Sequence, residues 1–187
     1  MIISPNDAIQ LGYITFPSSM TDDFQKKCVQ QNGIDITLDL LHSLSVDKLG
    51  ILSETERVYK PLTSVQPFNW VNVDELHFKI EHNVVYDWSS LFSLDIPENV
   101  CAILIVRSSL NRIGGTVNAG NYDSGYRGLI GGSLTSRAGD ILIAPGTRIA
   151  QIMFYKTESA SLYKGVYQQS NEVSYWGGKV ENNEKKL

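Results

Sequence analysis

The feature that most constrains the fold is a series of short apolar segments separated by turns. The segment NVCAILIV, residues 99–106, is almost continuously apolar and rich in β-branched residues, and GLIGGSL, DILIAPG, RIAQIMFY and SLYKGVY follow it at short spacing. Residues 34–40 and 75–82 alternate polar and apolar side chains. Gly or Pro separates several of these segments. Short strands at this spacing predict an all-β barrel or sandwich.

One short helix is expected at the start of the chain. Ser4 can cap it, Pro5 suits its first turn, and Asp7 favours the positive end of the helix dipole. Gly12 is a natural stop for this helix. Residues 46–60 fit no single pattern, and a loop is one interpretation of this segment.

Size and charge limit the class of protein. The 187 residues favour one domain, 1–187, and an apolar content of 42% supplies a sizeable core. The net charge of −4, with acidic and basic residues mixed along the chain, argues against broad binding to nucleic acid or to an anionic membrane. A locally basic pocket for a small anion is still compatible. Residues from about 168 to 187 are polar and charged, and we expect a mobile tail or lid.

The cysteines and histidines form no recognisable site. Cys28 and Cys101 are isolated and lack metal-ligand spacing, so we expect reduced thiols in a cytoplasmic protein. The histidines form no ligand motif. No apolar run approaches the length of about 20 residues that a membrane-spanning helix needs.

Polar clusters interrupt the strand-like segments at three places. NYDSGYRG, residues 121–128, reads as a turn, because Asp bonds local N–H groups and Gly allows positive φ; a hairpin tip is its simplest interpretation. RSSLNR, residues 107–112, offers guanidinium and hydroxyl donors that suit phosphate, or it is a strand end with surface arginines. Gln151 is a lone amide between apolar neighbours, which could also serve only to satisfy backbone groups.

Taken together and in order, these segments resemble the family of trimeric dUTPases and dCTP deaminases. The start MIISPNDAIQLG and VQQNGIDITLD resemble the deaminase branch, and RSSLNRIG resembles its Arg-Ser-Ser-Leu-x-Arg-Leu-Gly motif. AGNYDSGYRG resembles the shared Ala-Gly-x-Ile-Asp-x-x-Tyr-x-Gly hairpin, and TRIAQIMF resembles the Arg-Ile-Ala-Gln motif that follows. The resemblance implies a distorted jelly-roll or β-clip barrel of the dUTPase type with a short N-terminal helix, assembled as a homotrimer.

The resemblance also implies roles for residues of the hairpin. Asp123 would activate the attacking water and contact the sugar, since a carboxylate can accept a proton and orient an oxygen. Tyr126 would lie under the deoxyribose and leave no room for a 2′-hydroxyl. The backbone from Asn118 through Gly120 to Tyr122 would read the edge of the base.

Phosphate and metal contacts are implied by the other motifs. Asp35 would help to place hydrated Mg²⁺ through water, and Gln151 would contact phosphate or support that network. A triphosphate would be held, from a neighbouring subunit, by Arg107, Ser108, Ser109 and Arg112.

The C-terminal segment departs from both branches. In SYWGGKV, residues 174–180, Tyr175 or Trp176 could stack on the base and Lys179 could meet the γ-phosphate, but the Ser-Thr pair of the dUTPase motif is missing. A frayed tail with exposed aromatic residues is the alternative. Tyr167 matches the tyrosine of the deaminase branch, whereas Ser174 and Gly178 replace the Lys and Gln that follow it there.

The reaction is indicated by position 133, ten residues after Asp123. Deaminases of this family carry a catalytic Glu there, and this chain carries Ser133, whose hydroxyl is a poor base near neutral pH. We therefore expect an Mg²⁺-dependent dUTP diphosphatase that releases dUMP and pyrophosphate. The alternatives are a dCTP deaminase, a bifunctional enzyme, or a non-catalytic deoxynucleotide-binding regulator. Tyr122 replaces the family's Ile or Val, so a modified pyrimidine is also open as the substrate.

Overall fold

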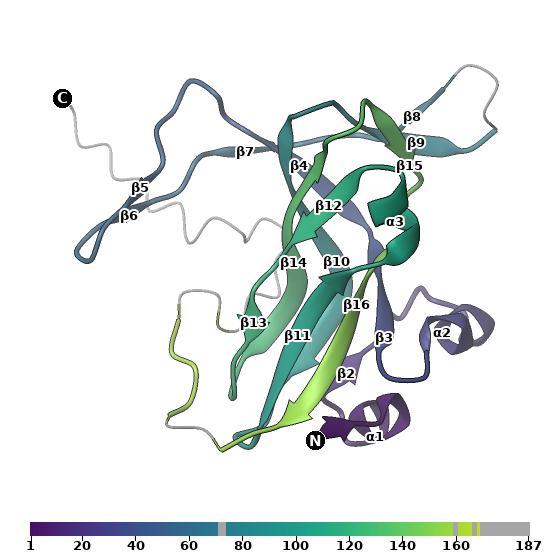
Figure 1. Ribbon diagram of the computed structural model, residues 1–187, viewed down its shortest axis with the longest axis vertical. Coiled ribbons are helices and arrows are strands. Elements are labelled where there is room, and N and C mark those ends of the chain that lie inside the picture. Colours follow the sequence, from purple (N-terminus) through teal and green to yellow (C-terminus); the bar gives the residue numbers. More distant parts are fainter. Residues whose placement is uncertain (71–73, 159–160, 166–167, 169–187) are drawn as a thin grey trace.

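Two antiparallel sheets contribute to one hydrophobic core in the computed structural model, which describes residues 1–70, 74–158, 161–165 and 168 (Figure 1). The first sheet has the order β1-β16-β11-β13, and β3 pairs with β16 beside β1. Its strands are Ile2–Ile3 (β1), Ile34–Leu38 (β3), Val100–Val106 (β11), Asn121–Tyr122 (β13) and Thr147–Lys156 (β16).

The second sheet has the order β12-β14-β10-β4-β7, and β2 also pairs with β10. Its strands are Ile14–Thr15 (β2), Leu40–Leu44 (β4), Leu62–Ser64 (β7), Val85–Asp95 (β10), Gly115–Asn118 (β12) and Arg127–Ser136 (β14). Short strands complete the β-structure: Ile51–Leu52 (β5), Arg57–Val58 (β6), Phe68–Asn69 (β8), Leu76–Ile80 (β9) and Ile141–Ile143 (β15). The all-β class is confirmed, and the pairings among the described residues form sheets without closing a barrel.

Side chains from both sheets meet in the core. Trp88 and Phe92 of β10 and Phe154 of β16 are almost fully buried. Burial of one large apolar side chain contributes roughly 1.5–3 kcal/mol. The long strand β10 bends between Ser89 and Ser93, where its register shifts, and this bend brings one end of it to β2.

The helices are α1 (Pro5–Gln10), α2 (Asp22–Cys28) and α3 (Ser108–Arg112). The expected start of α1 is confirmed, because Ser4 Oγ accepts a hydrogen bond from the Asp7 N–H at 3.1 Å. Sequence reasoning missed α2 and α3. For α2 the signals were present: Thr21 caps the helix, and acidic residues precede basic ones along it.

Several strand predictions need correction. Residues 34–38 alternate in sequence, but all five are buried. The apolar segment in β11 was expected to be buried, but Ile103 and Ile105 are about two-fifths exposed. The undecided segment 46–60 contains the exposed hairpin β5–β6, and residues 161–165 form no strand. That residues 1–187 form one domain with a mobile tail stays a prediction, because 169–187 lie outside the described residues.

A row of polar residues crosses the second sheet. Asn118, Ser133, Asp87 and His42 are cross-strand partners on β12, β14, β10 and β4. Asp87 Oδ2 and His42 Nδ1 are buried and have no hydrogen-bond partner in the part of the chain that the structure describes. Burial raises the pKa of Asp87 to about 7 and lowers that of His42. Separately, none of the helices in the described ranges has the length and apolar character to span a membrane.

The first prediction concerns the pH dependence of stability. The pKa of Asp87 lies above its ordinary value of 3.8, so this carboxyl favours the folded state when protonated and loses that contribution as pH rises through about 7. As the pH rises from 4.5 to 8, we expect the free energy of unfolding of Asp87→Asn to increase relative to that of the wild type, by an amount on the order of 2 kcal/mol. Urea unfolding at several pH values measures it. Asp95→Asn, an exposed carboxylate on the same strand, is the control, and a pH-independent difference for Asp87→Asn would refute the assignment.

Candidate functional site

A tight turn after β13 forms the centre of the candidate site. The Tyr126 N–H donates to the Asp123 carbonyl at 3.0 Å, and Gly125 has φ of +84°, a conformation that side-chain-bearing residues rarely adopt. The Gly125 N–H donates to the Ile96 carbonyl, and the Ile96 N–H donates to the Tyr126 carbonyl, both at 2.9 Å. The expected positive φ of the glycine is confirmed, whereas the Asp123 side chain bonds the Asn121 amide and no described backbone N–H. The bonds to Ile96 fix this turn to the chain just beyond β10.

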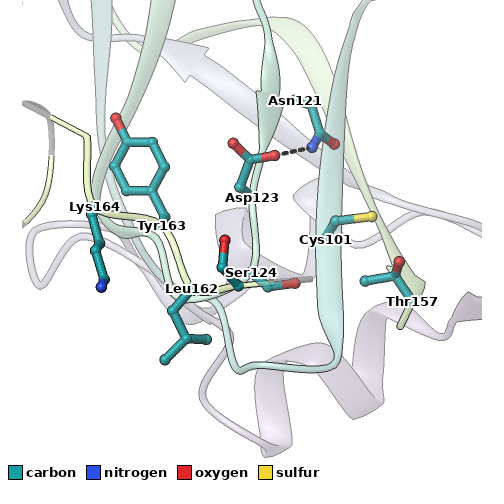
Figure 2. Close-up of a pocket in the computed structure, with 9 residues that line it drawn as sticks. Cys101, Asn121, Asp123, Ser124, Thr157, Leu162, Tyr163 and Lys164 are labelled. Carbon is teal, nitrogen blue, oxygen red and sulfur yellow. Dashed lines mark hydrogen bonds between the residues drawn. The ribbon is translucent and has the colours of Figure 1, made fainter. Parts of the chain in front are cut away.

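Asp123 lies exposed on the rim of a cavity of about 580 Å³. Its Oδ1 accepts a hydrogen bond from Asn121 Nδ2 at 2.6 Å. Figure 2 shows the carboxylate between the Asn121 amide and the ring of Tyr163, and the Lys164 side chain points away from the carboxylate. No other described group bonds the carboxylate, so one oxygen can face a ligand or a water molecule.

An adjoining cavity of about 250 Å³ has aromatic walls. It is lined by Gly120, Asn121, Tyr122, Asp123, Tyr126, Gly131 and Tyr163. The buried Tyr126 ring lies 5.2 Å from that of Tyr122 and 5.5 Å from that of Tyr163, between ring centres. Aromatic walls of this kind suit a flat ring or a sugar face. The structure thus brings together the expected residues Gly120, Tyr122, Asp123 and Tyr126.

Tyr122 is itself bonded inside this cavity. Its hydroxyl donates to the Gly131 carbonyl at 3.2 Å and accepts from the Gly131 N–H at 3.1 Å. Burial raises the pKa of the phenol far above its ordinary value, so the group is neutral and can make both bonds. Asn118 lies at the end of β12, opposite Ser133, and its side chain is exposed.

A second polar cluster surrounds Asp35 on β3. Asp35 Oδ2 lies 3.2 Å from Arg107 Nε and 3.2 Å from Arg148 Nη1, and Oδ1 accepts from Gln151 Nε2 at 3.2 Å. The Asp35 side chain is 1% exposed, and each arginine is 28% exposed. Gly33 permits the close approach of the strands, because a Cβ there would collide with Gln151 and with the Ile152 carbonyl.

One buried carboxylate pairs with two guanidinium groups, so the cluster keeps one excess positive charge. Burial raises the pKa of Asp35, and the Arg107 and Arg148 guanidinium groups act against that shift. Burial also raises the pKa of the neighbouring Cys28 to about 11, so this thiol is protonated and unreactive.

This environment does not fit the expected contact of Asp35 with hydrated Mg²⁺. Both carboxylate oxygens are already bonded by cationic or amide groups. Within the described ranges, no group of three His, Cys, Asp or Glu residues could hold a metal ion. The sequence predicts only a water-mediated contact of Asp35 with Mg²⁺, and its burial between two arginines was not predicted.

The expected phosphate residues lie at a distance from Asp123. Tyr122 pairs with Ala102 near the start of β11, whereas Val106 ends this strand four positions later, about 13 Å away. Ser108, Ser109 and Arg112 lie on α3 beyond that end and are exposed (Figure 1). One chain therefore does not bring these residues to Asp123.

Asn121 and Tyr163 are site residues that sequence reasoning missed as side chains. The sequence predicts only a backbone role for Asn121. Its position two residues before Asp123 could have indicated that the side-chain amide bonds the carboxylate. Tyr163 lies in a segment expected to be a strand, and its N–H donates instead to the Ser124 carbonyl at 2.7 Å. The predicted residues Tyr167, Tyr175, Trp176 and Lys179 lie outside the described residues.

The fold and the site define an all-β protein with an aromatic cavity beside an exposed carboxylate, and comparisons with known proteins identify its family. Residues 15–157 match the family model described as "dCTP deaminase-like". The chain is 31% identical over 150 residues to a probable deoxyuridine 5′-triphosphate nucleotidohydrolase of Methanosarcina mazei, covering 76% of this chain and 82% of that protein. It is 28% identical over 148 residues to the deoxyuridine 5′-triphosphate nucleotidohydrolase of Methanocaldococcus jannaschii, covering 79% and 91%.

A crystal structure of the 2′-deoxycytidine 5′-triphosphate deaminase from Agrobacterium tumefaciens has the same fold, with a TM-score of 0.59 at 19% identity. The match covers 82% of this chain and 47% of that one, so the present chain spans about half of that protein. The chain belongs to the dCTP deaminase-like family, within the superfamily of dUTPases and dCTP deaminases.

The second prediction tests the Asp35 cluster. Asp35→Asn would leave two guanidinium groups together without their buried counter-charge, and we expect a loss of about 3 kcal/mol in the free energy of unfolding. Asp95→Asn is the matched control, because its ion pair with Arg127 is more than half exposed and is worth about 1 kcal/mol or less. Chemical denaturation of both variants measures the difference. Equal stabilities would contradict a structural role for Asp35.

Proposed function

We propose that this chain is a dUTP diphosphatase, which hydrolyses dUTP to dUMP and pyrophosphate. The observation that carries the proposal is the position of Asp123, whose carboxylate stands on the rim of the aromatic cavity with one oxygen fixed by Asn121. The relatives named deoxyuridine 5′-triphosphate nucleotidohydrolases support it. Ser133, where a deaminase of this family would carry Glu, favours hydrolysis of phosphate over attack on the base.

Asp123 acts as the general base in this proposal. It takes a proton from water while the water oxygen bonds to the α-phosphorus, and the bond from that phosphorus to the bridging oxygen breaks to release pyrophosphate. The Asn121 amide holds the carboxylate in orientation. Tyr126 lies beneath the deoxyribose, and its hydroxyl, bonded to the Leu129 carbonyl at 2.7 Å, keeps the ring in place.

The triphosphate is held by residues of the second cluster and of α3. Ser108, Ser109 and Arg112 are exposed donors, and Arg107, directly before them in the chain, bonds the buried Asp35, as does Gln151. Because these residues lie far along β11 from Asp123, we infer that they serve the Asp123 of a neighbouring copy. A homotrimer with shared sites meets this requirement.

The C-terminal residues complete the site in the proposal. Tyr167, Tyr175 or Trp176 stacks on the nucleotide, and Lys179 meets the γ-phosphate. Gln168, which directly follows Tyr167, is attached to the turn, since its Nε2 donates to the Gly125 carbonyl at 2.7 Å and its Oε1 accepts from the Arg127 N–H at 3.0 Å.

Mg²⁺ belongs to the proposal as the ion that accompanies the triphosphate. Mg²⁺ favours phosphate oxygens and retains waters, so it needs few protein ligands. The Asp35 carboxylate is engaged by arginines, and we assign no catalytic step to the metal.

One observation supports a deaminase as the second candidate. Asp87 lies directly opposite Ser133 on β10, and its Oδ2 has no hydrogen-bond partner. Its pKa of about 7 is suitable for a general base near neutral pH. Asp87 could then replace the missing Glu in attack on a cytosine ring.

The third prediction separates these functions by their products. With Mg²⁺ and dUTP, dCTP or dTTP in parallel, we expect pyrophosphate from dUTP and no ammonia from dCTP. Asp123→Asn is expected to fold and bind nucleotide but to lose about a hundredfold or more in rate. Ammonia from dCTP that disappears in Asp87→Asn would instead establish the deaminase. Nucleotide binding with neither product would indicate a non-catalytic binding protein.

The fourth prediction tests the shared site. Asp123→Asn and Arg112→Ala should each be nearly inactive as pure proteins. After mixing, dissociation and reassembly, some sites combine an intact Asp123 with an intact Arg112, so we expect activity to return to a measurable fraction. Light scattering should give a trimer for each protein. A monomer, or mixtures that stay inactive, would contradict the shared site.

A further inference from the structure

The hydroxyl of Tyr122 occupies a pair of backbone groups that face the aromatic cavity. It donates to the Gly131 carbonyl and accepts from the Gly131 N–H, at 3.2 and 3.1 Å. Both residues line the cavity of about 250 Å³ that also contains Asp123 and Tyr126. A single oxygen thus satisfies one donor and one acceptor of the same residue.

The course of the chain explains why these backbone groups need a partner. β12 pairs with β14 only as far as Asn118 and Ser133. The chain then leaves β14, and β13 pairs with β11, with Tyr122 opposite Ala102. Among the described residues, the edge of β14 at Gly131 therefore has no neighbouring strand on this side. A buried N–H and C=O left unsatisfied would be costly, and the Tyr122 phenol removes this cost.

The edge of a pyrimidine base offers the same pattern. The N3–H of uracil is a donor and each adjacent carbonyl is an acceptor, so uracil can bond a backbone C=O and N–H together. Cytosine offers the same pair from its 4-amino group and N3. The base and the Tyr122 hydroxyl would therefore compete for Gly131.

We propose that the Tyr122 hydroxyl occupies base-reading groups of Gly131 until a matching nucleotide base displaces it. The inference rests on the proposed function for the location of the base. A base that restores both hydrogen bonds compensates for the displacement. A base without a donor beside an acceptor does not displace the hydroxyl, so its affinity is independent of the Tyr122 hydroxyl.

The cost of displacement is set by the packing of Tyr122. The side chain is 8% exposed, and its ring contacts that of Tyr126. Moving it breaks two hydrogen bonds to Gly131 and removes aromatic contact. Loss of the hydroxyl alone, as in Tyr122→Phe, leaves Gly131 unsatisfied in the free protein and should make a matching base bind more tightly.

The fifth prediction is a binding experiment that needs no turnover. Affinities for α,β-imido-dUTP and for its N3-methyl derivative are measured by calorimetry for the wild type, Tyr122→Phe, Tyr122→Val and Tyr86→Phe. Tyr86→Phe is the matched control, because it loses a buried phenol bonded to the Glu81 N–H away from the cavity. We expect Tyr122→Phe to bind the uracil compound about fivefold more tightly, and Tyr122→Val at least as tightly. The control, and the N3-methyl compound in every protein, should change less than twofold.

Unchanged or weaker binding of the uracil compound by Tyr122→Phe would overturn the inference, as would an equal gain for the N3-methyl compound. If Tyr122→Val fails to fold, the affinities of Tyr122→Phe alone decide the role of Tyr122. The result of this binding experiment does not depend on the enzyme assay. Tighter binding together with no pyrophosphate from dUTP would reject the diphosphatase and keep the role of Tyr122, whereas hydrolysis with unchanged affinity would reject only that role.

Discussion

The candidate site depends on one change of strand partner. After Asn118 the chain stops pairing with β14, and three residues later, at Asn121, it pairs with β11 of the other sheet. This switch opens the cavity beside Gly131 and places the turn with Asp123 on its rim. It also directs Tyr122 across the opening. A continuous β12–β14 hairpin would satisfy more backbone groups, but it would leave no space for a ligand.

The sequence was a reliable guide wherever local chemistry decides the conformation. Ser4 and Pro5 identify the start of α1, and the Asp-Ser-Gly turn is present with Gly125 in the left-handed region. These features depend on a few neighbouring residues. The motif order similarly identified the family, because it reflects a whole arrangement of strands.

Burial was predicted less well, since it depends on partners distant in sequence. The alternation of β3 suggests one exposed face, yet Asp35 is covered by Arg107 and Arg148, which come from 72 and 113 positions further along the chain. Conversely, Ile103 is exposed in a segment that reads as core. Tyr163 could not be assigned to the site from its own segment either, because its place follows from a backbone hydrogen bond to Ser124. No local pattern encodes such contacts.

The length of β11 limits which groups of one chain can act together in the proposed reaction. Attack at an α-phosphorus requires the general base and the phosphate-binding groups to contact the same nucleotide. Both must then lie within a few ångströms of the α-phosphate. Here the two ends of β11 separate them, with Asp123 beside the first residues of the strand and α3 beyond the last. The sheet is rigid over this distance, because β16 pairs with every residue of β11. With the phosphate held at α3 as proposed, a second copy of the chain would supply the other half of the site.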